Sequence, residues 1–249
     1  EYMRKKSVYF CLLAGIIFMF TGCAVLKTAL HHDYKINKYD KTENEEYIIL
    51  FHGIYGTEKD MKPIAEMLGN KNYNIISIQY PTNSDSVEMI SEKYIKPVID
   101  GLDNDKKVHF VVHSMGSGIL RYYLKNNNMD NLGKVVFISP PSHGSALADH
   151  FISKMLKDPL GEAVLQFSIK EDSFVNKLGD PDYSCYVLIG NKSNNPLYSV
   201  IIPGKDDGMV PLDGSKLDSC AYKVVDKASH TSILKDERTF NEIENYLKN

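Results

Sequence analysis

Six short runs of almost continuously apolar residues recur along this chain, and the stretches between them are long enough to hold a helix. The runs cover residues 47–53, 74–80, 108–114, 135–139, 186–190 and 221–226. Strands that are apolar on both faces are typical of a parallel sheet with helices packed on each side. Helical patterns occupy 60–68, 86–102, 115–125 and 238–248. We therefore predict an α/β fold with a doubly wound, mostly parallel sheet, helices on both faces, and a ligand site at the carboxyl ends of the strands.

The N-terminal residues have the pattern of a secretion signal. Basic residues at positions 4–6 precede an uncharged, mostly apolar run over 8–20, which ends close to Cys23. This arrangement resembles the signal peptide of bacterial lipoproteins, which implies cleavage before Cys23 and attachment of lipid to that cysteine. An uncleaved membrane anchor over 7–26 is the alternative. Both interpretations place the folded part in the bacterial cell envelope, outside the cytoplasm and attached to the membrane.

This pattern divides the chain into three segments. Residues 1–22 are predicted to be the signal peptide, and residues 23–46 the lipidated cysteine followed by a polar tether. Residues 47–249 are predicted to form one folded domain, with a small cap insertion over 145–180. With 249 residues, of which 43% are hydrophobic, the chain can bury one substantial core.

Charge and cysteine content narrow the function classes. A net charge of −3, without a stripe of lysine and arginine in the globular part, argues against nucleic acid as a partner. No cluster of cysteine and histidine has the spacing of a zinc site, and we expect no metal or organic cofactor. Cys185 and Cys220 are either a disulfide in an oxidising compartment or two free thiols.

The segment VVHSMGSG ends one of the predicted strands and begins a predicted helix. A serine on such a tight turn, Ser114, exposes its hydroxyl above the edge of the sheet, as a nucleophile requires. The usual motif has glycine two positions before the serine, where this chain has Val112. We expect Val112 to press on Gly116, which has no side chain and leaves room for it.

A serine hydroxyl needs a general base and an orienting carboxylate to act as a nucleophile. Of the eight histidines, His230 lies in the loop after the last predicted strand, whereas His113 precedes the serine on its strand and should point away from it. The loop after the preceding strand contains Asp206 and Asp207. We predict Asp207 as the acid and expect Asp206 to be solvated, because the two side chains of an extended segment point to opposite sides.

An oxyanion intermediate requires backbone amides that are already in place. The glycine turn in FHGIYG, after the first predicted strand, offers the amide of Ile54, and the residue after the serine offers the amide of Met115. The same turn is not a phosphate-binding loop, because it lacks the Lys-Ser/Thr ending that such loops contain.

Several separated motifs together resemble the α/β-hydrolase superfamily and its lipase-like and esterase-like members. They are HGIYG, HSMGSG, PPSHGSALAD, GNKSNNPLYSVIIPGKDDGMVP and ASHTSIL. The resemblance implies Ser114 as nucleophile, Asp207 as acid, His230 as base, and the Ile54 and Met115 amides as the oxyanion hole. The cap insertion is short for a lipase lid, and its apolar segments either roof an acyl pocket or simply pack on the core.

The predicted activity is that of a serine hydrolase that cleaves carboxylic esters through an acyl-enzyme. Its partners would be a small-molecule or lipid ester and, through the N-terminal lipid, a membrane. Acyl transfer and thioester cleavage use the same groups and remain alternatives, as does a non-catalytic envelope lipoprotein that retains the fold for binding.

Overall fold

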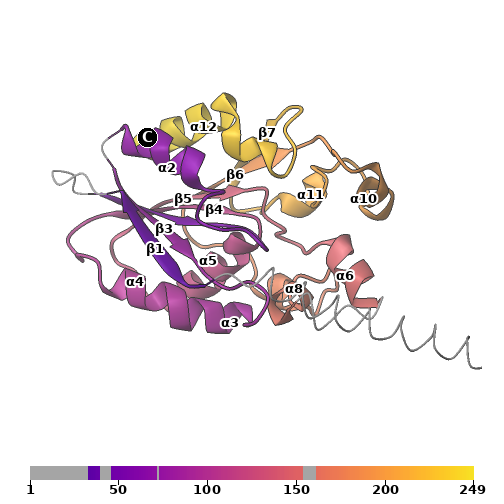
Figure 1. Ribbon diagram of the computed structural model, residues 1–249, viewed down its shortest axis with the longest axis horizontal. Coiled ribbons are helices and arrows are strands. Elements are labelled where there is room, and N and C mark those ends of the chain that lie inside the picture. The colour runs from indigo at the N-terminus through magenta and orange to yellow at the C-terminus, as the bar shows by residue number, and fades with distance from the viewer. Residues whose placement is uncertain (1–32, 40–45, 72, 154–160) are drawn as a thin grey trace, which may run out of the picture.

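The computed structural model describes residues 33–39, 46–71, 73–153 and 161–249 (Figure 1). The predicted signal peptide over 1–22 and the predicted lipidation site Cys23 lie outside the described residues. A seven-stranded sheet in the order β1-β3-β2-β4-β5-β6-β7 runs through the centre. All neighbouring strands are parallel except β1 and β3. The doubly wound, mostly parallel sheet that the apolar runs predict is therefore confirmed.

Each of the six predicted strands corresponds to a strand of the sheet, and β1 is additional. The strands are β1 (Lys35–Tyr39), β2 (Tyr47–Phe51), β3 (Asn74–Gln79), β4 (Val108–His113), β5 (Leu132–Ile138), β6 (Cys185–Gly190) and β7 (Ala221–Val225). The residues of β3 and β4 are all buried, as expected for strands covered on both faces. The expectation of full burial is wrong for β7, because it is an edge strand of the described sheet and its first three residues are exposed.

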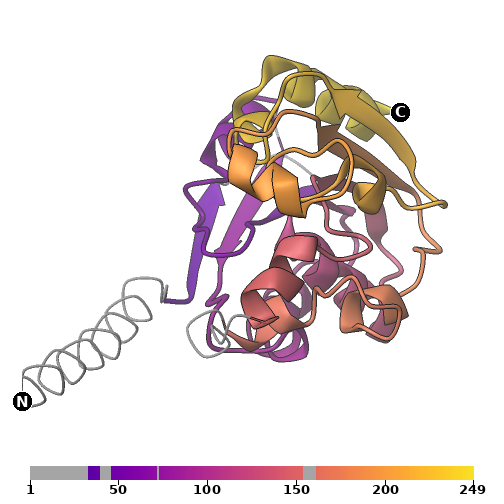
Figure 2. The same cartoon turned by 90° about the vertical axis from the view of Figure 1, so that its right-hand side faces the viewer.

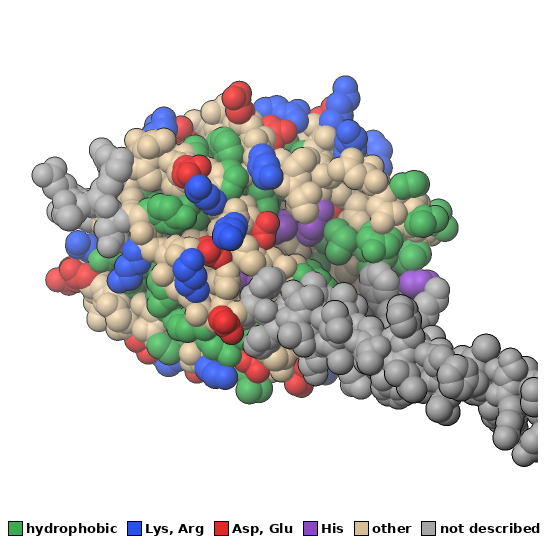
Figure 3. All heavy atoms as spheres, in the orientation of Figure 1, with side chains coloured by type: hydrophobic (Ala, Val, Ile, Leu, Met, Phe, Trp, Pro, Cys, Tyr) green, Lys and Arg blue, Asp and Glu red, His purple; other side chains and the backbone are tan. Residues whose placement is uncertain are grey.

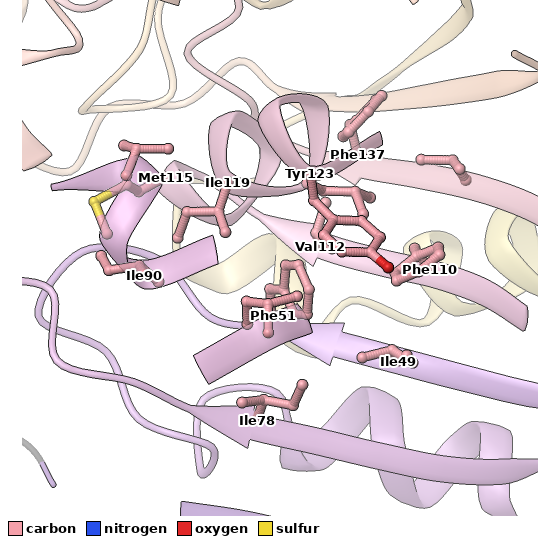
Figure 4. Close-up of a cluster of buried hydrophobic side chains, with 14 of the residues drawn as sticks. Ile49, Phe51, Ile78, Ile90, Phe110, Val112, Met115, Ile119, Tyr123 and Phe137 are labelled. Atoms are coloured by element: carbon pink, nitrogen blue, oxygen red, sulfur yellow. The ribbon is translucent and has the colours of Figure 1, made fainter. Parts of the chain in front are cut away.

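Helices cover both faces of the sheet, with α2 and α12 on one side and α3 to α5 on the other (Figure 1). Figure 4 shows side chains from β2, β4 and α5 meeting in the core of the second side. The helical elements are α2 (Lys62–Gly69), α3 (Val87–Ile90), η1 (Ser91–Ile95), α4 (Lys96–Asp100), α5 (Met115–Asn126), α6 (Ala146–Ser153), α8 (Glu162–Leu165), α9 (Phe174–Lys177), α10 (Pro196–Ile201), α11 (Leu212–Ser215), η2 (Ser232–Lys235) and α12 (Glu237–Lys248).

The segment predicted to be a tether contains strand β1, so the prediction for 23–46 is wrong over these five residues. β1 pairs antiparallel with β3, and Lys35 faces Gln79 at the carboxyl end of β3. Its lysines and its half-exposed side chains suit an edge strand. Because β1 is antiparallel, the chain enters the sheet at the same edge to which the parallel strands deliver their carboxyl ends.

A buried arginine on α5 connects the insertion after β5 to this helix. Arg121, on α5, donates hydrogen bonds to the carbonyl oxygens of Ser142, Val175 and Gly179. Figure 2 shows the insertion, drawn in salmon, facing the orange segment that carries α10 and α11, and α6 contacts α10 directly. The insertion is thus held close to the carboxyl edge of the sheet, where the predicted site lies.

A disulfide joins Cys185, at the start of β6, to Cys220, which directly precedes β7. Of the two alternatives left open by the sequence, the structure contains the bridge. Closing a loop of 35 residues stabilises a fold by about 4 kcal/mol in the chain-entropy account of disulfides.

Candidate active site

Ser114 occupies a strained turn between β4 and α5. Its backbone has φ of 52° and ψ of −122°, a conformation that residues other than glycine rarely adopt. Its amide donates a hydrogen bond to the carbonyl of Ile138 on the neighbouring strand β5. Backbone strain of this kind costs on the order of 1–3 kcal/mol and persists only where the surroundings impose it. The turn raises the serine hydroxyl above the carboxyl edge of the sheet.

A chain of two hydrogen bonds links the serine to a buried carboxylate. The Ser114 hydroxyl lies 2.9 Å from Nε2 of His230, and Nδ1 of His230 lies 2.8 Å from Oδ2 of Asp207. The carboxylate accepts the Nδ1 proton, which leaves Nε2 free to accept the serine proton. Asp207 is 1% exposed and His230 is 7% exposed, so little water competes for these bonds. The structure thus brings together all three residues that the sequence predicts for proton transfer.

Asp207 is ionised although it is buried. Burial raises the pKa of its carboxyl group, but the charge and hydrogen bond of His230 and the Val210 amide outweigh this effect and leave the pKa below its ordinary value. Its second oxygen accepts hydrogen bonds from the amides of Met209 and Val210, at 3.0 and 2.9 Å. These bonds fix the carboxylate so that it faces the imidazole ring.

Asp206 is buried, contrary to the expectation that it would be solvated. Its Oδ1 accepts hydrogen bonds from the amide of Gly208 at 2.7 Å and from the hydroxyl of Ser199 at 3.1 Å. The side chain closes the turn that carries Asp207 rather than contacting His230. The rule that neighbouring side chains of an extended segment point to opposite sides therefore predicted that only Asp207 faces His230. It did not predict the burial of Asp206.

His113 contacts His230, a relationship that the sequence did not predict. Nε2 of His113 lies 2.9 Å from the backbone carbonyl of His230, and the two rings are 4.8 Å apart. Burial, together with the charge of His230, lowers the pKa of His113 to about 3. His113 is therefore neutral near pH 7, donates from Nε2 to the carbonyl, and adds no positive charge beside His230. Its signal in the sequence is a histidine directly before the serine on a buried strand.

The loop after β2 is fixed by a buried histidine and a tyrosine. Nδ1 of His52 lies 2.8 Å from the carbonyl of Gly53, and Nε2 accepts the amide of Tyr80 at 3.2 Å. The two rings stack with centroids 4.2 Å apart. A Cβ atom on Gly53 would lie 2.9 Å from Cβ of Ser114, so only glycine allows this approach. The loop therefore passes directly beside the serine and carries Ile54 past it.

Ile54 and Met115 line the same cavity as Ser114. Met115 is the first residue of α5, and the amides in the first turn of a helix have no acceptor within it. The two residues predicted for the oxyanion hole therefore flank the serine from two different elements, the loop after β2 and the start of α5.

Gly116 is required for a different reason from the one that we expected. A Cβ atom there would lie 2.8 Å from Cβ of Phe51, 3.0 Å from the carbonyl of His52 and 3.2 Å from the hydroxyl of Tyr80. The closest contacts are thus between the turn and the segment that includes β2, and Val112 is not among the nearest neighbours of this position. Val112 is fully buried in the core between the sheet and α5.

Two cavities meet at Ser114. The first, of about 120 Å³, is almost entirely apolar, and the insertion contributes Leu147, Ala148, Val164 and Phe167 to its wall. The second, of about 530 Å³, lies on the side of His230 and includes polar groups such as Asp60 and Thr231. The insertion therefore forms one wall of a pocket next to the serine, which favours the acyl-pocket interpretation of its apolar segments.

Within the part of the chain that the structure describes, no group of histidine, cysteine and acidic side chains could hold a metal ion. Nor does any described helix have the length and hydrophobicity needed to cross a membrane.

The low pKa of His113 predicts a dependence of stability on pH. The unfolded histidine titrates near 6.5 and the folded one near 3, so the unfolded state binds more protons between these values. The free energy of unfolding should fall as the pH drops from 6.5 to 3, by up to about 1.4 kcal/mol per pH unit from this group. Urea unfolding at several pH values should give a smaller slope of the free energy of unfolding against pH for His113→Gln, whose longer side chain places an amide donor near the position of Nε2. An unchanged slope would contradict the assignment.

Comparison with known proteins reveals similarity at the level of structure. No protein-family model and no curated protein matches the sequence. The mature lipase BlEst2 of Bacillus licheniformis is 21% identical with a TM-score of 0.66, over 86% of this chain and 98% of that one. An esterase of Pyrococcus furiosus is 16% identical with a TM-score of 0.59, over 89% and 92%. A bromoperoxidase of Bacillus anthracis is 14% identical with a TM-score of 0.60, over 87% and 95%.

These structures superpose on most of the present chain, and at such identities the similarity is one of fold. Together with the mostly parallel seven-stranded sheet, it establishes that this chain has the α/β-hydrolase fold.

Proposed function

We propose that the protein is a serine hydrolase that cleaves carboxylic esters, with a small-molecule or lipid ester as substrate. The observation that carries the proposal is the pair of hydrogen bonds from Ser114 through His230 to Asp207, opening into an apolar cavity. The presence of lipases and esterases among proteins of the same fold agrees with it. No metal or organic cofactor takes part in the proposed reaction.

The proposed reaction has two halves. The Ser114 oxygen attacks the ester carbonyl carbon while its proton passes to Nε2 of His230, and the amides of Ile54 and Met115 bind the resulting oxyanion. His230 then gives the proton to the leaving alkoxide as the bond between carbon and alcohol oxygen breaks. In the second half, water attacks the acyl-enzyme, loses its proton to His230, and Ser114 recovers that proton as the acid departs. Asp207 stabilises the imidazolium throughout.

The two cavities at the serine suggest which part of the ester lies where. The leaving alcohol must receive its proton from His230, and the cavity of about 530 Å³ is the one that His230 lines. The acyl group then occupies the apolar cavity of about 120 Å³. A cavity of about 150 Å³ holds one benzene molecule, so the acyl pocket suits a short chain better than a long one.

Acyl transfer and thioester cleavage begin with the same acyl-enzyme and differ in the acceptor or the leaving group. Product analysis with added alcohols separates transfer from hydrolysis, because a transferase gives the new ester even when water is in large excess. The non-catalytic alternative requires that the serine be unreactive.

A fluorophosphonate probe tests the central proposal, because it reacts with a serine that a neighbouring base activates. We expect the wild-type protein to be labelled stoichiometrically and Ser114→Ala to remain unlabelled. Ser117→Ala serves as a matched control, since Ser117 is buried nearby and its hydroxyl bonds to the carbonyl of Ser114 rather than to a base. A folded wild-type protein that does not react would refute catalysis and favour the binding lipoprotein.

Adjacent aspartates provide a second test. Asp207→Asn should lower kcat for a soluble ester by about 10⁴-fold, the loss seen when the acid of a serine protease is made neutral. Asp206→Asn keeps an oxygen acceptor for Gly208 and Ser199 and should have a much smaller effect. Steady-state kinetics of the two variants measures this difference. A larger loss of kcat in Asp206→Asn than in Asp207→Asn would show that Asp207 is not the acid.

We further propose that the protein is a lipoprotein of the bacterial cell envelope, attached to the membrane through lipid on Cys23. The support is the basic residues, the apolar run and the cysteine of the N-terminal sequence. Cells fed radioactive palmitate should incorporate label into the wild-type protein and not into Cys23→Ser. Absence of label from both proteins would argue for the uncleaved anchor, and labelling of both would show that the lipid is attached to a residue other than Cys23.

A further inference from the structure

Helix α10 presents an apolar face to solvent. Leu197 is 76% exposed and Val200 is 85% exposed, and no residue of the helix is buried. Pro196 and Pro203 beside them are also exposed. In Figure 3, hydrophobic side chains gather on the right-hand side of the molecule, where Figure 1 places α10. Exposed apolar side chains that cluster in this way mark an interaction surface more often than a scattered single residue does.

Local capping stabilises this helix in addition to its contacts with α6. The side-chain oxygen of Asn195 accepts hydrogen bonds from the amides of Leu197 and Tyr198, and Pro196 occupies the first position of the helix. Proline at that position has the backbone angle of a helix in advance. Leu197 and Val200 are therefore exposed on a helix whose start is fixed by its cap.

The charges of the chain segment that carries this face favour an anionic occupant. Residues 191–205 contain two lysines, Lys192 and Lys205, both exposed, and no acidic residue. In a two-fold contact between two copies, the same surface meets itself, so these lysines would be brought together. Lysines that flank apolar side chains instead match the surface of an anionic bilayer, where the cations meet headgroups and the apolar groups enter the hydrocarbon boundary.

The position of α10 in the fold agrees with such an occupant. α10 follows the carboxyl end of β6, and Asp33 is held near the carboxyl end of β3 by a 2.7 Å hydrogen bond from Gln79. The proposed lipidation site Cys23 is ten positions before Asp33, a distance of at most ~35 Å for an extended chain. The attachment therefore reaches the molecule at the same edge of the sheet that carries α10.

We propose that the face formed by Lys192, Pro196, Leu197, Val200 and Lys205 docks on the surface of an anionic phospholipid bilayer. Here it is called the α10 face. Docking of this face turns the carboxyl edge of the sheet toward the membrane. α10 also contacts α6, which contributes Leu147 and Ala148 to the apolar cavity at Ser114. An ester in the lipid layer would then lie next to the entrance of the proposed acyl pocket. The docking itself does not depend on hydrolysis.

The chain contains no tryptophan, so a single introduced tryptophan reports on its own position. The full chain carrying Leu197→Trp is incorporated into vesicles of equal parts phosphatidylcholine and phosphatidylglycerol. We expect its emission to shift to the blue relative to the same variant at low concentration without vesicles, and to be quenched by brominated phospholipids. The matched control is Tyr222→Trp. Tyr222 is 50% exposed and lies at the amino end of β7, on the opposite edge of the sheet.

The control separates docking from mere attachment. The N-terminal lipid brings both variants to the vesicle, but only the indole of Leu197→Trp should contact brominated lipid. Adding Lys192→Gln and Lys205→Gln to this variant should weaken insertion of the indole by about fivefold for each lysine removed. High salt should reduce this difference, as it does for charges at a surface.

Three results would overturn the proposal. The emission of Leu197→Trp could remain unquenched in the anionic vesicles, or Tyr222→Trp could be quenched as strongly as Leu197→Trp. The blue shift could also appear without vesicles and grow with protein concentration, which would show that a second copy covers the face.

Turnover of a soluble ester, measured on each variant, distinguishes this proposal from the proposed function. If turnover persists while docking fails, the docking alone is wrong. If the wild type has no turnover, the proposed function fails while the fluorescence of Leu197→Trp still reports on docking.

Discussion

The close approach of β2 to the turn after β4 is the constraint on which the proposed active site depends. Gly53 and Gly116 are the two positions where the backbones meet, and a Cβ atom at either would lie within 3.0 Å of a neighbouring residue. This contact holds Ser114 in its strained conformation and carries Ile54 past the serine. The positions of Ser114 and of the two proposed oxyanion donors are therefore set by packing between two parallel strands rather than by flexible loops.

The buried ionisable groups at the site differ in charge because their surroundings differ. Asp207 keeps its charge because His230 and two backbone amides compensate for burial. His113 is buried beside His230 without a carboxylate of its own and is therefore neutral, so it can donate a hydrogen bond without opposing a positive charge on its neighbour. One histidine is thus paired with an anion, while the adjacent one is held in its neutral form.

Apolar periodicity predicted the sheet because strands buried on both faces leave an unbroken hydrophobic run. It missed β1, because the sequence KINKY mixes polar and apolar residues at an exposed edge and so resembles a polar linker. Position at strand ends identified Ser114, Asp207 and His230, since parallel strands deliver their ends to one edge. Three features of the site depend on packing between segments that are distant in sequence. They are the burial of Asp206, the contact of His113 with His230, and the close neighbours of Gly116. No local pattern contains that information.

The disulfide has a consequence for the proposed site although it lies at the other end of the strands. Cys185 and Cys220 join the starts of β6 and β7, and the loops that leave the far ends of these strands carry Asp207 and His230. β7 is an edge strand with exposed residues, the kind of element that opens first in local unfolding. A covalent bond at the start of β7 opposes the local unfolding that would separate Asp207 from His230. The disulfide thus helps to preserve the hydrogen bond between Asp207 and His230, which lies at the opposite ends of these strands.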